Sequence, residues 1–317
     1  MTGTVATPTT NASLIDAIGN TPLVEISRFA ANPRVRMLAK LEGMNPTGSV
    51  KDRVARHLVD GLEREDRLRP DSIILEPSSG NTGISLAMIC LIRGYRLTVV
   101  MPDNVTRERR QLLEIYGASI IDSPGAIGSN GAIEMARRLV REDPRYVMAD
   151  QYANLLNPLA HYETTGVEIV TDCPSVEVFV AGLGTGGTLM GVGRRLREHN
   201  PSVRIHAAEP MPGEAVQGLR SLDEGFVPEI FDASTIDGRH LVTTAESIEA
   251  TRRLSRTEGI FAGVSSGGVL TVASRLAAAM ESGTIVALLA DGGWKYLSED
   301  LWLSDPDDER LEALNLW

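Results

Sequence analysis

The chain has 317 residues, of which 43% are apolar and 23% are charged, a composition typical of a folded globular protein rather than a disordered one. Its net charge of −11 disfavours nucleic acid and anionic membranes as partners, because both carry negative charge. The longest charge-free apolar run, at about residues 84–92, is too short to span a bilayer, so we expect no membrane segment.

Two cysteines, Cys90 and Cys173, occur without a CxxC pair, which argues against a zinc cluster or a disulfide scaffold. The five histidines are scattered without the spacing of metal ligands, so we expect no metal. Residues 1–11 lack the basic and apolar stretches of a secretory signal. The sequence therefore predicts a protein of the reducing cytoplasm.

Short segments rich in β-branched residues alternate with segments of helical periodicity. Strands are predicted at residues 35–42, 72–76, 96–101, 176–181, 203–208 and 284–290. Helices are predicted at residues 51–64, 132–141, 189–197 and 247–257. The alternation predicts an α/β fold with parallel sheets covered on both faces, and two separate strand–glycine loop–helix units predict two lobes with a ligand cleft between them. The acidic residues 304–310 are predicted to form a solvated tail or a short terminal helix.

Residues 45–53, Asn-Pro-Thr-Gly-Ser-Val-Lys-Asp-Arg, lie between a predicted strand and a predicted helix. Pro46 and Gly48 end the strand, and Ser49 is predicted to cap the helix. Lys51 then lies in the first turn, where the positive helix end disfavours its charged form. A free amine there can form a Schiff base with a carbonyl compound, although the lysine taken alone is better explained as an ordinary surface residue.

Residues 76–83 and 182–188 are loops of small residues that each follow a predicted strand. Both leave backbone N–H groups exposed at a helix start, which suits a carboxylate in the first loop and a phosphate in the second. The second loop also matches G-x-G-x-x-G, and Glu209 follows at about the spacing of a ribose-binding acid. A dinucleotide site is therefore an alternative for this window.

Residues 263–268, Gly-Val-Ser-Ser-Gly-Gly, precede another apolar helix, and the hydroxyl of Ser265 could face a pyridine nitrogen. The stretch also matches the serine-hydrolase pattern G-x-S-x-G. That fold places its histidine after the serine, whereas no histidine follows His240. Chain order therefore argues against a hydrolase.

Taken in order, these motifs resemble the cysteine synthase family, the pyridoxal-phosphate (PLP) enzymes of fold type II related to the tryptophan synthase β subunit. The resemblance extends from about residue 13 to residue 298 and rests on residues 18–23, 45–53, 79–83, 110–118, 184–188 and 259–268. It implies two lobes, each with a mainly parallel twisted sheet flanked by helices, and PLP in the cleft. The implied large lobe, residues 1–44 plus 155–317, binds the phosphate of PLP, and the implied smaller mobile lobe, residues 45–154, carries the substrate-carboxylate loop.

The resemblance also implies a role for each motif. Lys51 would hold PLP as a Schiff base and act as the acid–base group at the α-carbon of the substrate, while Asn81 would contact the 3′-oxygen of the ring and Ser265 its nitrogen. The residues implied in phosphate binding are Gly184, Thr185, Gly186, Gly187 and Thr188. Those implied in substrate binding are Ser78, Ser79, Gly80, Thr82 and Gln151. Threonine is common in the family at the position of Ser78, but serine keeps the hydroxyl.

The implied reaction is L-cysteine biosynthesis by β-replacement, catalysed by a transferase. An activated serine loses its leaving group to give an aminoacrylate that adds a sulfur nucleophile, with ping-pong kinetics. A serine rather than an acid at the pyridine nitrogen does not enforce its protonation, which favours elimination. Alternatives that share the cofactor motifs are a cystathionine β-synthase and a serine or threonine dehydratase. A nicotinamide-dependent oxidoreductase or a non-catalytic binding protein would belong to a different class.

Residues 217–228 and 292–298 resemble the cysteine synthase B, or O-phosphoserine sulfhydrylase, subgroup. This implies O-phosphoserine as the favoured donor, with O-acetylserine as the alternative, and sulfide or a thiocarboxylated carrier protein as the sulfur source. Arg220 would bind the donor phosphate, although a surface ion pair with Asp223 or Glu224 is an alternative. The resemblance also suggests a homodimer. A solvated helix face is predicted for Arg107, Arg109 and Arg110.

Overall fold

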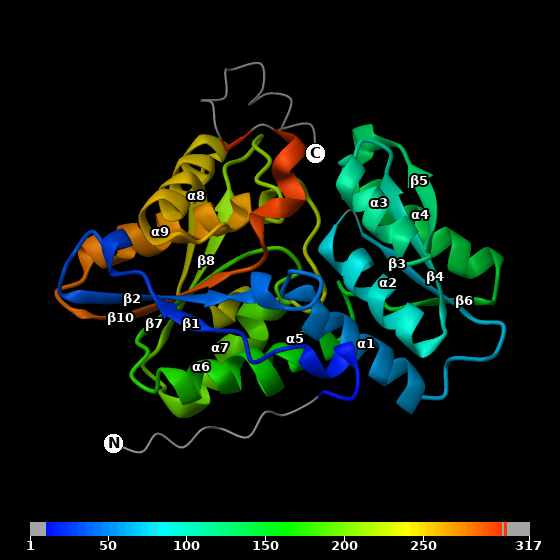
Figure 1. Cartoon of the computed structure of the whole chain (residues 1–317), viewed down its shortest axis with the longest axis horizontal. Coiled ribbons are helices and arrows are strands. Elements are labelled where there is room, and N and C mark those ends of the chain that lie inside the picture. Colours follow the sequence, from blue (N-terminus) through cyan, green and yellow to red (C-terminus); the bar gives the residue numbers. More distant parts are fainter. Residues whose placement is uncertain (1–10, 79, 300, 303–317) are drawn as a thin grey trace.

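The computed structural model of the protein describes residues 11–78, 80–299, 301 and 302. They form two β-sheets that stand side by side, each with helices on both faces (Figure 1). The acidic stretch at residues 304–310 lies outside the described residues. Within the described ranges, no helix is long and apolar enough to cross a membrane.

The larger sheet has six strands, in the spatial order β1 (Leu23–Glu25), β2 (Val35–Leu41), β10 (Gly283–Leu289), β7 (Val178–Gly182), β8 (Arg204–Pro210) and β9 (Gly238–Val242). All neighbours are parallel except β1, which runs antiparallel to β2. The pairing of β2 with β10 joins an early and a late segment of the chain in the middle of this sheet.

The smaller sheet has four parallel strands, in the order β5 (Ser119–Ser123), β4 (Arg96–Pro102), β3 (Ile73–Pro77) and β6 (Tyr146–Met148). Because neighbouring strands are parallel, their carboxyl ends lie at one edge of the sheet. The loop that follows β3 is the predicted substrate-carboxylate loop, so this edge positions it.

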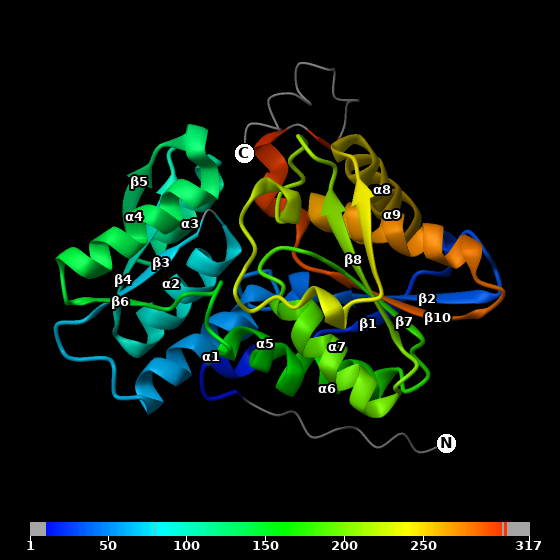
Figure 2. The same cartoon turned by 180° about the vertical axis from the view of Figure 1, so that it is seen from behind.

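Nine α-helices lie within the described residues: α1 (Lys51–Arg64), α2 (Asn81–Arg93), α3 (Arg107–Ile115), α4 (Gly128–Glu142), α5 (Leu156–Ala160), α6 (Gly166–Asp172), α7 (Gly187–His199), α8 (Thr244–Glu258) and α9 (Val264–Ala279). Helices α8 and α9 cover one face of the larger sheet and α5 to α7 cover the other, as Figures 1 and 2 show. Both faces of the sheet are therefore apolar: Val180 packs toward one core and the adjacent Phe179 toward the other.

The predicted α/β fold with two mainly parallel sheets is confirmed, and each of the six predicted strands is present. The four strands that were not predicted, β1, β5, β6 and β9, are the edge strands of the two sheets. An edge strand is covered on fewer sides, so its sequence lacks the continuous apolar run that identifies a central strand.

Helix α1 packs its apolar face into the core of the smaller sheet, with Val54, Leu58 and Leu62 buried. Ile15 and Ile18 join the same core, although both precede residue 45. The lobe boundaries at residues 44/45 and 154/155 stay a prediction.

A buried charge network holds the start of α1 against the larger sheet. Arg53 Nε and Nη2 donate to the two carboxylate oxygens of Glu42 at 2.8 and 2.9 Å, and its Nη1 and Nη2 donate to those of Glu168 at 2.6 and 2.7 Å. Lys40 donates to Glu168 at 2.7 Å, and Thr21 donates to Glu42 at 2.6 Å. The network therefore joins β2, α1 and α6 immediately behind Lys51.

We expect Arg53→Met to destabilise the fold by about 3–5 kcal/mol, because it leaves the buried Glu42 carboxylate without a cation. Arg36→Met is the matched control, since Arg36 pairs with Glu25 at 2.9 Å on the exposed surface and should cost at most about 1 kcal/mol. Urea denaturation measures both losses. Similar losses for the two variants would show that the network does not hold α1.

Candidate active site

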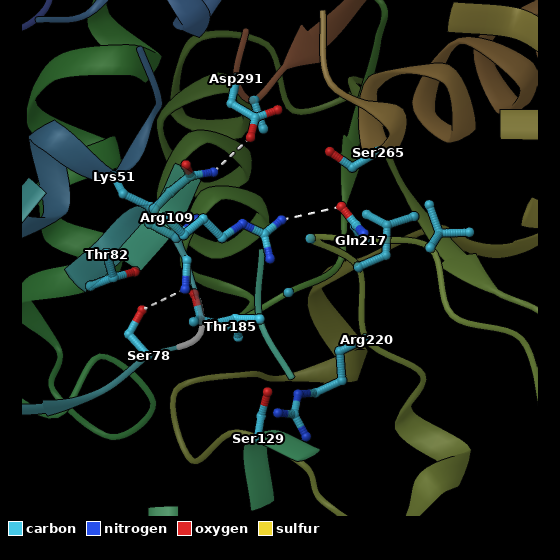
Figure 3. Close-up of a pocket in the computed structure, with 18 of the residues that line it drawn as sticks. Lys51, Ser78, Thr82, Arg109, Ser129, Thr185, Gln217, Arg220, Ser265 and Asp291 are labelled. Atoms are coloured by element: carbon cyan, nitrogen blue, oxygen red, sulfur yellow. Dashed lines mark hydrogen bonds between the residues drawn. The ribbon is translucent and has the colours of Figure 1, made fainter. Parts of the chain in front are cut away.

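The starts of α1, α2, α4 and α9 and the loop before α7 line one cavity of about 200 Å³ between the two sheets, and Figure 3 shows side chains of its lining. The predicted site residues that line it are Lys51, Ser78, Gly80, Asn81, Thr82, Gln151, Gly184, Thr185, Arg220 and Ser265. Gly186 and Thr188 line an adjoining hollow that shares Lys51 and Ser265, while Gly187 is buried at the start of α7. Ser79 lies outside the described residues. Motifs from four distant parts of the sequence thus meet at one place.

Lys51 is the first residue of α1 and lines the cavity. The residue before the helix is Val50 rather than Ser49, whose hydroxyl accepts a 3.3 Å hydrogen bond from the Lys51 backbone N–H. Burial lowers the pKa of Lys51 against the opposing attraction of Asp291 and Glu42. Within the described residues its side-chain amine makes no hydrogen bond, so it is available to a ligand.

The glycine loop before α7 is shaped by close neighbours. Gly186 has φ +87°, and a side chain at Gly187 would place Cβ only 2.0 Å from Asn157 Oδ1. Asn157 Nδ2 donates to the Thr185 hydroxyl at 2.9 Å. The loop can therefore keep its backbone open to the cavity only if its central positions are glycine.

His161 supports the same loop from behind. It is buried in the short π-helix η5 (His161–Thr165). Its Nε2 lies 3.3 Å from the Thr188 hydroxyl, and its Nδ1 lies 3.1 Å from the Thr165 hydroxyl. Burial lowers the pKa of His161 well below its usual value, which keeps the imidazole neutral. Neither His161 nor Asn157 could be predicted, because neither belongs to a sequence motif and only the fold brings them to the loop.

Glu209 would be the ribose-binding acid of the alternative dinucleotide site. Its side chain is fully buried and is hydrogen-bonded to Arg239. Its two carboxylate oxygens accept hydrogen bonds from Arg239 Nε at 2.6 Å and Nη2 at 2.9 Å. A ribose hydroxyl would have to displace this bidentate pair. The geometry therefore argues against a dinucleotide site at this loop.

The loop that follows β3 carries hydroxyl and amide groups at the edge of the smaller sheet. The Ser78 hydroxyl oxygen accepts from the backbone N–H groups of Gly80 and Gly83 at 3.3 and 3.1 Å, which leaves its own hydrogen free to donate. Thr82 donates to Gln151 Oε1 at 2.6 Å. These groups can bind a carboxylate.

Asn81 is the first residue of α2, and its amide has two strong partners. Nδ2 donates to Asp291 Oδ2 at 2.7 Å, and Oδ1 accepts from Lys295 Nζ at 2.6 Å. The Tyr296 hydroxyl donates to the same Asp291 oxygen at 2.5 Å. No role was predicted for Asp291 or Lys295, because only the fold brings them from behind the last strand to Asn81.

The prediction of a solvated helix face was wrong for Arg109. Its side chain is buried and lines the cavity. Its Nη2 donates to Gln217 Oε1 at 3.2 Å, and its guanidinium lies over the Tyr296 ring, 5.1 Å from the centroid. Helix α3 presents this side toward the larger lobe, which a periodicity argument on α3 alone could not indicate.

Arg220 also lines the cavity. Its Nη1 donates to Asn130 Oδ1 at 3.1 Å, and its guanidinium lies 5.4 and 4.8 Å from the ring centroids of Tyr152 and Phe226. Asp223, one of the two acids predicted as alternative partners, lies 3.5 Å from Arg239 instead. Arg220 is thus held beside the cavity by neutral groups.

The residues at this cavity fit PLP. A buried amine without a hydrogen bond can take the aldehyde, and open backbone amides at the start of α7 suit the phosphate. The Ser265 hydroxyl lines the cavity at the start of α9, and the facing Gly218 leaves room beside it. Fold and site together define a fold-type II PLP enzyme.

Comparison with known proteins gives the same class. The family model described as pyridoxal-phosphate dependent enzyme matches residues 14–291, and the chain belongs to this family. It is 43% identical to cysteine synthase B of Pseudomonas aeruginosa, over 92% of this chain and 97% of that protein. Among solved structures, a cysteine synthase from Entamoeba histolytica is similar with a TM-score of 0.88 and 32% identity, over 99% of this chain and 98% of that one. An O-ureido-L-serine synthase is similar with a TM-score of 0.87 and 38% identity, over 96% and 100%. The predicted membership of the PLP-dependent cysteine synthase family is confirmed.

We expect Gly187→Ala to weaken PLP binding by about tenfold, because the added Cβ displaces Asn157 and frees the Thr185 hydroxyl. Gly193→Ala on the same helix is the control, since its Cβ would meet Ile205 only at ordinary distances of 3.4 Å and more. Titration of the apoprotein with PLP measures both. Equal affinities would contradict the role assigned to Gly187.

Glu76, at the end of β3, predicts a pH dependence of stability. Its carboxylate accepts from the Asp150 backbone N–H at 2.9 Å, and burial together with the nearby Asp150 charge raises its pKa to about 8. The folded protein then binds more protons than the unfolded chain between about pH 4.3 and 8, so stability falls as the pH rises through this range.

Glu76→Gln does not titrate, so its melting temperature should fall less than that of the wild type between about pH 6 and 9. Glu25→Gln, on the exposed edge strand β1, is the control and should follow the wild type. Thermal melts at several pH values measure the difference. Parallel curves for wild type and Glu76→Gln would refute the assignment.

Proposed function

We propose that the chain forms L-cysteine by β-replacement with O-phosphoserine as its donor, and that Lys51 is the catalytic residue. The observation that carries the proposal is that Lys51 and Arg220 line one cavity. The amine serves the reacting carbon of the amino acid, and the guanidinium serves the phosphate at its other end. O-acetylserine, which lacks that phosphate, would gain nothing from Arg220.

Bound PLP supplies the electron withdrawal that loosens the bonds at the α- and β-carbons of an amino acid. Lys51 removes the proton from the α-carbon, and its lowered pKa favours the free amine that this step needs. Gly184 to Thr188 hold the cofactor phosphate, and Ser265 and Asn81 contact the ring.

The substrate carboxylate binds to the loop after β3. Ser78 can donate its hydroxyl hydrogen, and Gln151 Nε2 makes only a long 3.5 Å bond to the Pro77 carbonyl, so both can donate to a carboxylate. Gly80 and Thr82 complete this subsite, and a role for Ser79, which lies outside the described residues, stays a prediction. The carboxylate is thereby held at the smaller sheet while the leaving group extends toward Arg220.

The sulfur nucleophile is sulfide or the thiocarboxylate of a small carrier protein. Both are anions, and Arg109 and Arg220 give the cavity positive charge in a chain whose net charge is −11.

We also propose that the protein acts as a homodimer in the cytoplasm. The exposed side chains of Met44, Phe261 and Trp294 around an apolar hollow support a contact between subunits, and two buried free cysteines suit a reducing compartment.

Donor comparison tests the proposal. With sulfide as the nucleophile, Arg220→Ala should lower kcat/KM for O-phosphoserine by about 100-fold, because two charge-assisted hydrogen bonds are lost, and should change that for O-acetylserine by less than about threefold. Arg194→Ala, in the exposed ion pair with Glu198, is the control. Cysteine formation is followed by mass spectrometry. Equal losses for both donors would remove O-phosphoserine as the specific donor.

A further inference from the structure

The chain has only three lysines, Lys40, Lys51 and Lys295, and carries its other basic charge on arginines. Lys40 belongs to the charge network behind α1, and Lys51 lines the cavity. Lys295 lies in the short helix η8 (Gly293–Glu299) and is fully buried. Burial of a charged group costs free energy unless it is paired, so a lysine in this position calls for a function.

Lys295 makes one short hydrogen bond, from Nζ to Asn81 Oδ1 at 2.6 Å. On the other side of the same amide, Asn81 Nδ2 donates to Asp291 Oδ2 at 2.7 Å. An ammonium group only donates and a carboxylate only accepts, so these two partners fix which way round the amide lies. Nδ2 carries a second hydrogen, and Asn81 lines the cavity together with Lys51.

Nearby carboxylates offset part of the cost of burying the Lys295 charge. Burial lowers the pKa of Lys295 to about 8, against the attraction of nearby carboxylates. The charged groups that face it are Asp291 and Asp52, which attract it, and Arg109 and Lys51, which repel it. A positive charge 2.6 Å from Oδ1 polarises the amide and makes its N–H groups stronger donors.

We propose that Lys295 is a positioning residue for the cofactor, which holds the Asn81 amide so that its second N–H is directed to the 3′-oxygen of PLP. The inference rests on the proposed function, because it assumes that Asn81 contacts this oxygen. Without the ammonium group, Oδ1 loses its partner and the amide can turn. The quantity to measure is therefore how much Lys295 contributes to the binding free energy that the ring oxygen provides.

The test compares two ligands on the apoprotein: PLP and its analogue that lacks the 3-hydroxyl group. Wild type should bind PLP more tightly than the analogue. Lys295→Met should weaken PLP binding by about tenfold and analogue binding by less than about twofold, so that the preference is lost. Lys295→Arg, which keeps a charged donor, should recover most of the preference. Quenching of tryptophan fluorescence reports both affinities without any turnover.

Lys40→Met is the matched control, because it removes a buried lysine that does not line the cavity, and any effect on Lys51 through the charge network would change the binding of both ligands alike. It should lower the melting temperature but keep the preference for PLP over the analogue. If Lys295→Met weakens both ligands equally, weakens neither, or behaves like Lys40→Met, the inference is overturned. If Lys295→Met does not fold, Lys295→Gln is measured in the same way. Failure of the wild type to bind PLP at all would instead overturn the proposed function.

Discussion

The active site depends on the buried ion network that anchors the first turn of α1. Arg53 lies two residues after Lys51, and its guanidinium is shared between Glu42, directly after β2, and Glu168, 115 residues further along the chain than Arg53. Burial alone would raise the pKa of Glu168, but Arg53 and Lys40 lower it to about 2, so the carboxylate stays charged at physiological pH. Rotation of α1 would separate these paired charges, and the network therefore fixes where Lys51 points.

The central part of the fold could be predicted from the sequence and its edges could not. Strands such as β7 and β10 are buried on both faces and read as continuous apolar runs. Helix α1 begins and ends where its periodicity indicates, at Lys51 and Arg64. The edge strands carry a weaker signal: β9 contains Gly238, Arg239 and His240 within five residues. Such a strand is held by its neighbour β8, which sequence patterning does not show.

Some residues of the candidate site could likewise be predicted from the sequence, and others could not. Glycine loops and small-residue motifs could be located from the sequence, because backbone access to an anion leaves a local composition signal. The residues that brace these motifs left none. Asn157 and His161 reach the glycine loop only after α5 packs against α7, and Lys295 reaches Asn81 across 214 residues of sequence. Arg109 shows the limit most clearly, since its helix carries adjacent arginines and only the opposing lobe decides which of them is buried.

The reactivity of Lys51 has a different main cause from the one its position in the helix suggests. A charge in the first turn of a helix is perturbed by about 0.3–1 kcal/mol, which is less than one pKa unit. Burial can shift a lysine by several units, and it is the leading cause of the lowered pKa of Lys51. Asp291 and Glu42 oppose the shift, and Asp291 is also bonded to Asn81 and Tyr296. The pKa of the amine is thus lowered mainly by the packing of protein groups around Lys51, and the helix end contributes less.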